Sequence, residues 1–245
     1  MSKDSVLILG ARSDIGLAVA HKFASLGYPI QLAARNVETL EPNRADITTR
    51  YKVDVTLHEF DALQPNSFAG FVDSLPKLPL IAVCAVGFMG EQSQNEQDLA
   101  ASSLVMRSNY EGPAGILAEL ANRFETHGSG TLVGISSVAG LRGRATNYVY
   151  GSAKAGFTAF LSGLRNRLAK KGVHVVTVLP GFVATQMTEN MDLPEWLTAQ
   201  PMEVAEKIAT AVERGKNVIY VRSIWWLIMT IICNIPENVF KKLKL

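Results

Sequence analysis

Five short apolar runs recur along the chain, and none alternates between apolar and polar positions. Each is rich in valine, isoleucine, leucine or alanine. Runs of this kind are typical of strands that are buried on both faces of a parallel sheet. We therefore predict strands over residues 6–9, 29–34, 80–86, 130–136 and 174–180.

Apolar residues with the spacing of a helix occur between these strands. Apolar side chains recur every three or four positions between residues 15 and 26, and again between residues 157 and 168. Strands that alternate with helices predict an α/β fold, a doubly wound Rossmann-type parallel sheet with helices on both faces. The chain has no Gly-, Pro- or Ser-rich linker, so we expect a single domain over residues 1–222, followed by an apolar and basic segment, 223–245.

Composition narrows the class of protein. Hydrophobic residues make up 48% of the 245 positions and charged residues 19%, which is ample for a globular core. The net charge of +2 argues against nucleic-acid binding, and two isolated cysteines predict neither a disulfide framework nor a metal site. The N-terminus lacks the pattern of a signal peptide, and no apolar run reaches the ~18 to 20 residues that span a bilayer. We expect a cytoplasmic catalytic body.

The first predicted strand runs into a glycine turn, GARSDIG, and then into a helix. Glycine lets the backbone turn sharply and approach a pyrophosphate, while the start of a helix offers free N–H groups and a positive dipole end. The turn therefore predicts a dinucleotide-binding site. Its candidate contacts are Gly10, Arg12, Ser13, Ile15 and Gly16.

The end of the second predicted strand indicates which nicotinamide cofactor is preferred. NAD-binding enzymes place a carboxylate there to bind the ribose 2′-hydroxyl. This chain has Ala34 followed by Arg35, and arginine binds phosphate through a planar fork of donors. We predict NADP(H), with Arg35 on the 2′-phosphate and Arg12 as a second partner. The alternative is that Arg35 is a solvated loop residue.

Tyr150 and Lys154 are four residues apart, a spacing that places both on one face of a helix. A nearby ammonium group stabilises a phenolate, so we expect Lys154 to lower the pKa of Tyr150 from its ordinary value of about 10. A tyrosine of this kind can donate a proton to a developing alkoxide or accept one from an alcohol. Ser137 follows an apolar strand upstream, and its hydroxyl can hold a substrate carbonyl.

These motifs resemble the short-chain dehydrogenase/reductase family. The similarity lies in ISSVAG and YGSAK at their separation, in the glycine turn and in PGFVAT, and it extends over residues 5–220. It implies an oxidoreductase in which Ser137, Tyr150 and Lys154 are catalytic. It also implies that Asn109 relays protons to the lysine through a water.

The resemblance assigns further cofactor contacts. Gly87 is retained from the family segment that follows the fourth strand. Asp61 in EFDAL corresponds to the residue that touches the adenine, because its distance to the next strand is more plausible, although Asp54 in VDVT fits the motif better. The contacts to the nicotinamide carboxamide come from Pro180, Gly181, Val183 and Thr185.

Several positions depart from the family pattern. Leu9 replaces a threonine before the glycine turn, and Asp14 replaces its middle glycine. A carboxylate near a pyrophosphate is unfavourable unless it points away or caps the helix, and we expect Asp14 to be the N-cap of the helix. Cys84 lies where the family has an asparagine, and we expect a small buried hydrophobe there.

CAVGFMG, NYVYGSAKAGF and the C-terminal IPENVFKKLKL resemble one branch of the family, the decaprenylphosphoryl-2-keto-β-D-erythro-pentose reductases. The resemblance implies NADPH-dependent reduction of the 2-keto group of a polyprenyl-phosphate-linked pentose in cell-envelope polysaccharide synthesis. It implies a flavin oxidase partner that supplies the ketone. It also implies a homodimer or homotetramer.

The apolar segment IWWLIMTIIC, residues 224–233, suits a lipid-bearing substrate. Tryptophan favours the membrane–water interface, and the lysines that follow suit anionic headgroups. The segment predicts a reversible, peripheral contact with the inner face of the plasma membrane. The alternative is a helix that packs on the substrate pocket or at a subunit interface.

Two other functions stay open. The chain could act on a small or acyl-linked ketone or alcohol, with its tail serving only subunit contacts. It could also be a non-catalytic NADP-binding regulator, although a binding module does not need Asn109, Ser137, Tyr150 and Lys154 together. Fold alone does not decide between these functions.

Overall fold

Seven parallel strands form the centre of the protein, whose computed structural model describes residues 3–189 and 191–243. Their order is β3-β2-β1-β4-β5-β6-β7. The winding direction reverses between β1 and β4, and ligands of such sheets bind at the carboxyl ends of the strands beside that point. The strands are β1 Val6–Leu9, β2 Ile30–Ala34, β3 Val55–Glu59, β4 Ile81–Cys84, β5 Gly130–Ile135, β6 Val173–Pro180 and β7 Val218–Val221.

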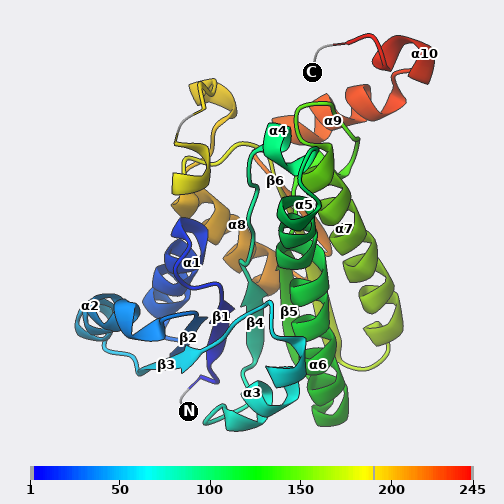
Figure 1. Ribbon diagram of the computed structural model, residues 1–245. Helices are drawn as coiled ribbons and strands as arrows, with labels where there is room; N and C mark the ends of the chain where they lie inside the picture. Colours follow the sequence, from blue (N-terminus) through cyan, green and yellow to red (C-terminus); the bar gives the residue numbers. More distant parts are fainter. Residues whose placement is uncertain (1–2, 190, 244–245) are drawn as a thin grey trace.

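Helices cover both faces of this sheet (Figure 1). On one face α1, α2 and α8 form a core with residues such as Ile8, and on the other α3, α6 and α7 pack around residues such as Leu7. Both side chains are fully buried, which explains why the central strands read as continuous apolar runs. The helices are α1 Asp14–Ser25, α2 Glu41–Tyr51, α3 Phe68–Ser74, α4 Gln92–Asn95, α5 Leu99–Met106, α6 Gly112–His127, α7 Tyr148–Leu168, α8 Pro201–Glu213, α9 Ile224–Asn234 and α10 Glu237–Phe240.

The predicted doubly wound fold and all five predicted strands are confirmed, with strand ends shifted by at most two residues. The sequence did not predict the other two strands, β3 and β7. They form the two edges of the sheet, and each buries only one side chain, Val55 in β3 and Val221 in β7. Because an edge strand is covered less completely, it needs no continuous apolar run.

After β7 the chain crosses the carboxyl edge of the sheet as α9 and α10, at the top of Figure 1. α9 buries Trp225 and Met229 but leaves Trp226 and Ile231 more than half exposed. It therefore has one face against the domain and one apolar face turned outward. Within the described residues, no helix is long and apolar enough to cross a membrane.

Arg142 fastens this C-terminal segment to the domain. Its guanidinium donates to the carbonyl oxygens of Cys233 and Ile235, at 3.1 and 3.3 Å, and pairs with the Glu237 carboxylate at 2.7 Å. The same group lies over the Phe240 ring, 4.1 Å from its centroid. These contacts fix both α9 and α10 beside the loop that precedes α7.

Two helical glycines offer a matched test of packing. A Cβ at Gly112 would lie 2.2 Å from the backbone oxygen of Ala62, whereas a Cβ at the exposed Gly163 would meet nothing within 4 Å. We expect Gly112→Ala to lower the free energy of unfolding by about 1–3 kcal/mol, because overpacking displaces backbone. Gly163→Ala should raise it by roughly 0.5–1 kcal/mol, because alanine loses less entropy in a helix. Chemical denaturation measures both values, and similar shifts would contradict this difference in packing.

Candidate active site

The glycine turn connects β1 to α1 at the carboxyl edge of the sheet. Gly10 has a φ of +81°, in the left-handed region that favours glycine, and a Cβ there would lie 2.9 Å from the backbone nitrogen of Val86. A Cβ at Gly16 would lie 2.7 Å from the oxygen of Gly10. The turn can therefore pack this closely only because both positions lack a side chain.

The expectation that Asp14 caps α1 was wrong, because Ser13 is the cap. Ser13 has extended backbone, and its Oγ accepts a hydrogen bond from Gly16 N at 3.0 Å. Asp14 is instead the first helical residue, and its carboxylate accepts a hydrogen bond from Gln186 N at 2.8 Å. The carboxylate thus joins α1 to the segment that follows β6.

One cavity, with about 1210 Å³ of empty space, gathers six of the candidate cofactor residues near the ends of β1, β2, β3 and β4. Asp61 lies in its wall, whereas Asp54 precedes β3 at the opposite end of that strand. This placement favours Asp61 over Asp54. The candidate residues in the lining are Gly10, Arg12, Ser13, Arg35, Asp61 and Gly87.

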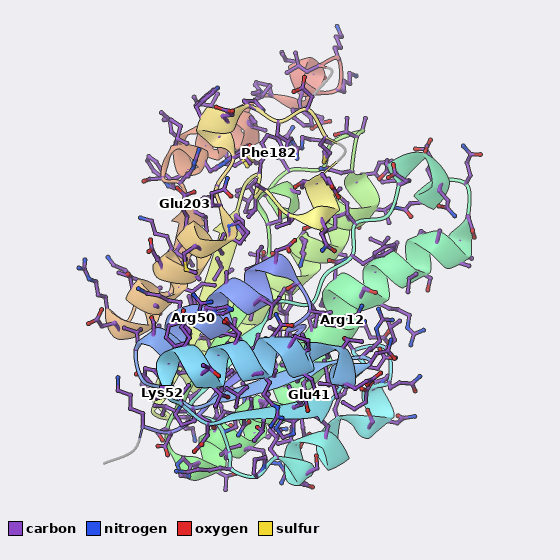
Figure 2. The ribbon with its side chains drawn as sticks, turned by 90° about the vertical axis from the view of Figure 1, so that its left-hand side faces the viewer. Arg12, Glu41, Arg50, Lys52, Phe182 and Glu203 are labelled. Carbon is purple, nitrogen blue, oxygen red and sulfur yellow. The ribbon has the colours of Figure 1, made fainter. Side chains whose placement is uncertain are left out.

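The arginines of this first cavity are exposed and close to each other. Arg12 lies in the turn before α1, on the side of the molecule that Figure 2 views, and its Nη1 donates to the oxygen of Arg35 at 3.4 Å.

Sequence reasoning missed Glu59, the last residue of β3. Its carboxylate accepts the N–H groups of Asn36 and Val37, both at 3.0 Å, so it orders the loop directly after Arg35. An acidic residue at a strand end was the available signal.

A second cavity gathers three of the four catalytic candidates, and Asn109 is not part of its lining. Ser137 follows β5, and Tyr150 and Lys154 lie one turn apart on α7. This cavity has about 880 Å³ of empty space, and it shares the wall from Ala85 to Gly87 with the first cavity. The further candidate residues in its lining are Ile15, Pro180, Gly181, Val183 and Thr185.

Lys154 is buried, with 3% of its surface exposed, and its Nζ donates to the oxygen of Ile135 at 3.0 Å. Burial lowers the pKa of Lys154 from its ordinary value of 10.5 to about 8. Burial likewise raises the pKa of Tyr150 to about 12, although the neighbouring Ser137 hydroxyl acts to lower it. The expectation that Lys154 lowers the phenol pKa was therefore wrong for this structure. Desolvation dominates, and Tyr150 is a protonated phenol at neutral pH.

Asn109 fixes the segment that follows β4. It is fully buried in a π-helical turn, Arg107–Glu111, a feature often found at functional sites. Its Nδ2 donates to the oxygens of Phe88 and Val105, and its Oδ1 accepts from Phe88 N at 3.2 Å. A Cβ at Gly87 would lie 3.2 Å from that Oδ1 and 3.6 Å from Lys154 Nζ. Asn109 and Lys154 therefore both border the space that a side chain at Gly87 would fill.

Trp225 also lines the catalytic cavity, in agreement with the alternative that this segment is a helix packed on the substrate pocket. A Cβ at Gly181 would lie 1.9 Å from the indole, so the indole occupies the space that a side chain there would fill. The indole Nε1 donates to the oxygen of Leu197 at 3.2 Å, and its ring meets Phe182 edge-on at 5.1 Å. Figure 2 labels Phe182 near the C-terminal helices. The helix α9 thus forms part of the cavity wall.

The buried ammonium predicts a pH dependence of stability. The unfolded chain binds the Lys154 proton more tightly than the folded protein does, so protonation favours unfolding and stability rises between pH 8 and 10.5. Relative to Lys154→Met, which has no charge, the wild-type free energy of unfolding should rise by about 3 kcal/mol over that range. Denaturant titrations at several pH values measure the difference. A constant difference would contradict the lowered pKa.

Comparisons with known sequences agree with this geometry. The family model described as short chain dehydrogenase matches residues 4–196. An uncharacterized oxidoreductase of Mycobacterium tuberculosis is 39% identical over 219 residues, which cover 88% of this chain and 87% of that protein. An uncharacterized oxidoreductase of Streptomyces coelicolor is 33% identical over 249 residues, which cover 98% of this chain and 95% of that protein.

Solved structures share the fold over nearly the whole chain. A short-chain dehydrogenase from Sphingobium yanoikuyae in complex with NADPH has a TM-score of 0.81 at 23% identity, covering 96% of this chain and 97% of the other. One from Burkholderia cenocepacia in complex with NADP has a TM-score of 0.82 at 18% identity, covering 98% and 97%. The chain belongs to the short-chain dehydrogenase/reductase family of NAD(P)-dependent oxidoreductases.

Proposed function

We propose that the protein uses NADPH to reduce a ketone to a secondary alcohol. One observation carries this proposal. Ser137, Tyr150 and Lys154 line one cavity, and that cavity adjoins another one whose wall includes the glycine turn. Tyr150 is protonated at neutral pH, and a protonated phenol is the form that donates a proton to a developing alkoxide.

The residues of the cavity have distinct roles in this reaction. A bound nicotinamide cofactor supplies the hydride that reaches the ketone carbon. Ser137 and Tyr150 hydrogen-bond the ketone oxygen, and Tyr150 donates the proton that completes the alcohol. Lys154, whose ammonium donates to Ile135 O, would also hydrogen-bond the nicotinamide ribose, and Asn109 holds the neighbouring backbone and a relay water. Orientation and stabilisation of the developing alkoxide supply most of the acceleration.

The residues of the first cavity fit a phosphorylated dinucleotide. Two glycines permit close backbone approach at the start of α1, and Arg12 and Arg35 form no ion pair within the described residues. Two structural neighbours are complexes with NADPH and NADP. Arg35 and Arg12 bind the 2′-phosphate, and Asp61 contacts the adenine. Thr185, with the backbone from Pro180 to Val183, holds the nicotinamide carboxamide.

The substrate that we propose is a polyprenyl-phosphate-linked 2-keto-pentose used in cell-envelope polysaccharide synthesis. Apolar side chains in the cavity wall support a lipid-bearing ligand, among them Phe182, Met187 and Trp225. The exposed face of α9, with Trp226 and Ile231, supports a peripheral contact with a membrane surface. A flavin oxidase that supplies the ketone and a homo-oligomeric state stay predictions from the family resemblance.

Substitution of the proton donor tests the reaction. We expect Tyr150→Phe to lower kcat by at least about 10²- to 10⁴-fold, because the general acid is lost, while NADPH binding stays nearly unchanged. Turnover is followed by NADPH oxidation and cofactor binding by fluorescence titration. Tyr148→Phe, on the exposed side of the same helix start, is the control and should keep full activity. Retained turnover in Tyr150→Phe would overturn the assignment.

The substrate class is tested with the wild-type enzyme. We expect NADPH oxidation with a membrane-lipid extract that contains the polyprenyl-phosphate 2-keto-pentose at a far higher kcat/KM than with a water-soluble ketone that lacks a lipid. Turnover of the soluble ketone alone would retain the chemistry of Tyr150 but exclude the lipid substrate. The apolar face of α9 would then be explained as a contact between subunits.

Cofactor preference is tested at Arg35. We expect Arg35→Ser to lower kcat/KM for NADPH by about 10- to 100-fold, because a charged hydrogen bond to phosphate is lost, and to leave kcat/KM for NADH nearly unchanged. Arg50→Ser is the control, since Arg50 pairs with Asp46 on α2 and lies outside the lining of both cavities. Figure 2 labels this arginine. Equal losses with both cofactors would refute the role of Arg35.

A further inference from the structure

Three polar side-chain atoms near the start of α7 are buried without a hydrogen-bond partner in the described part of the chain. They are Nε of Arg144, Oδ1 of Asn147 and Nε2 of Gln92. Arg144 and Asn147 line the catalytic cavity together with Ser137 and Tyr150. Unpartnered buried polar atoms are uncommon in proteins, and in a cavity wall a ligand can satisfy them.

Arg144 carries a charge that no carboxylate of the described residues offsets. Burial lowers its pKa, with no opposing effect from an acidic neighbour. Arg142, two positions earlier, provides the contrast, because Cys233, Ile235 and Glu237 accept its hydrogen bonds. One arginine of this loop thus holds the C-terminal helices, while the other lines the cavity and has a buried Nε without a hydrogen-bond partner.

The start of α7 adds to the positive potential at this place. The helix is 21 residues long, and Asn147 at its N-cap makes no capping hydrogen bond with its side chain. A helix N-terminus attracts anions, and a guanidinium donates to oxyanions in pairs. Arg144 and the first turn of α7 are therefore complementary to an anionic group beside Tyr150.

We propose that Arg144, with Asn147 beside it, binds a phosphate group of the substrate in the wall of the catalytic cavity. The substrate class is a ketone with a phosphate ester or diester on a neighbouring carbon, because both groups must fit one cavity. This inference rests on the proposed function, which places the reacting carbonyl at Tyr150. A lipid phosphodiester and a soluble phosphate ester share this chemistry, and the experiments separate them.

Binding of inorganic phosphate tests the site without turnover. Protein saturated with NADP⁺ has its cofactor phosphate sites filled, so calorimetry reports on a separate anion site. We expect Arg144→Met to weaken phosphate binding at least about 10-fold, through loss of a charged hydrogen bond, and Arg144→Lys to recover part of the affinity. Arg123→Met, on the surface of α6, is the control and should bind phosphate as the wild type does. Undetectable binding to the wild type, or binding that Arg144→Met leaves intact, would overturn the proposal.

Kinetics with matched ketones tests the role of this site in catalysis. For hydroxyacetone phosphate and the lipid-linked keto-pentose, Arg144→Met should raise KM about 10- to 100-fold and leave kcat nearly unchanged. For hydroxyacetone, which has no phosphate, KM should not change. If Arg144→Met raises KM for only one of the two phosphorylated ketones, the phosphate that this site binds belongs to that ketone's class, lipid-linked or soluble. An equal rise in KM for hydroxyacetone would overturn the proposal. If the wild type reduces no ketone yet binds phosphate through Arg144, the proposed function fails and the anion site remains.

Discussion

The buried ammonium of Lys154 is the charge around which the catalytic cavity is arranged. A buried cation is costly unless neighbouring groups stabilise it, and Ile135 O, at the end of β5, accepts a hydrogen bond from the ammonium. Close to the ammonium, Gly87 leaves the space that a Cβ would occupy, and Asn109 holds the backbone after Gly87 in place. The ends of β4 and β5 and the start of α7 must therefore keep their mutual positions for the charge to be accommodated. Burial likewise raises the pKa of the Tyr150 phenol.

The sequence predicts this fold best where burial is complete. The central strand β1 is covered on both faces, and a residue such as Leu7 has no alternative to an apolar identity. The edge strand β3 buries only one of its five side chains, so its residues follow no buried pattern and its position could not be predicted. The prediction of the N-cap of α1 was wrong for another reason. Serine and aspartate are both good N-cap residues, so residue type does not choose between the adjacent Ser13 and Asp14. The choice depends on backbone conformation, and Ser13 is the residue with the extended backbone of an N-cap.

Within the candidate site, local geometry could be predicted and non-local environment could not. The spacing of Tyr150 and Lys154 places both on one side of α7 wherever that helix lies. The pKa of each depends on burial by segments far away in the chain, among them the end of β5. The same holds for Arg144. Arg142 lies two positions earlier in the same loop and pairs with Glu237, whereas Nε of Arg144 has no hydrogen-bond partner among the described residues. Only the folded structure separates the two arginines.

Gly181 and Trp225 form a pair whose members constrain each other during evolution. The indole fills the volume of a side chain at position 181, so a relative that keeps the tryptophan in this place must also keep the glycine. A relative that loses the aromatic ring is released from that restriction and has an opening where this protein has a wall. The two positions together therefore offer a marker for sorting homologous sequences into those with a closed pocket and those with an open one.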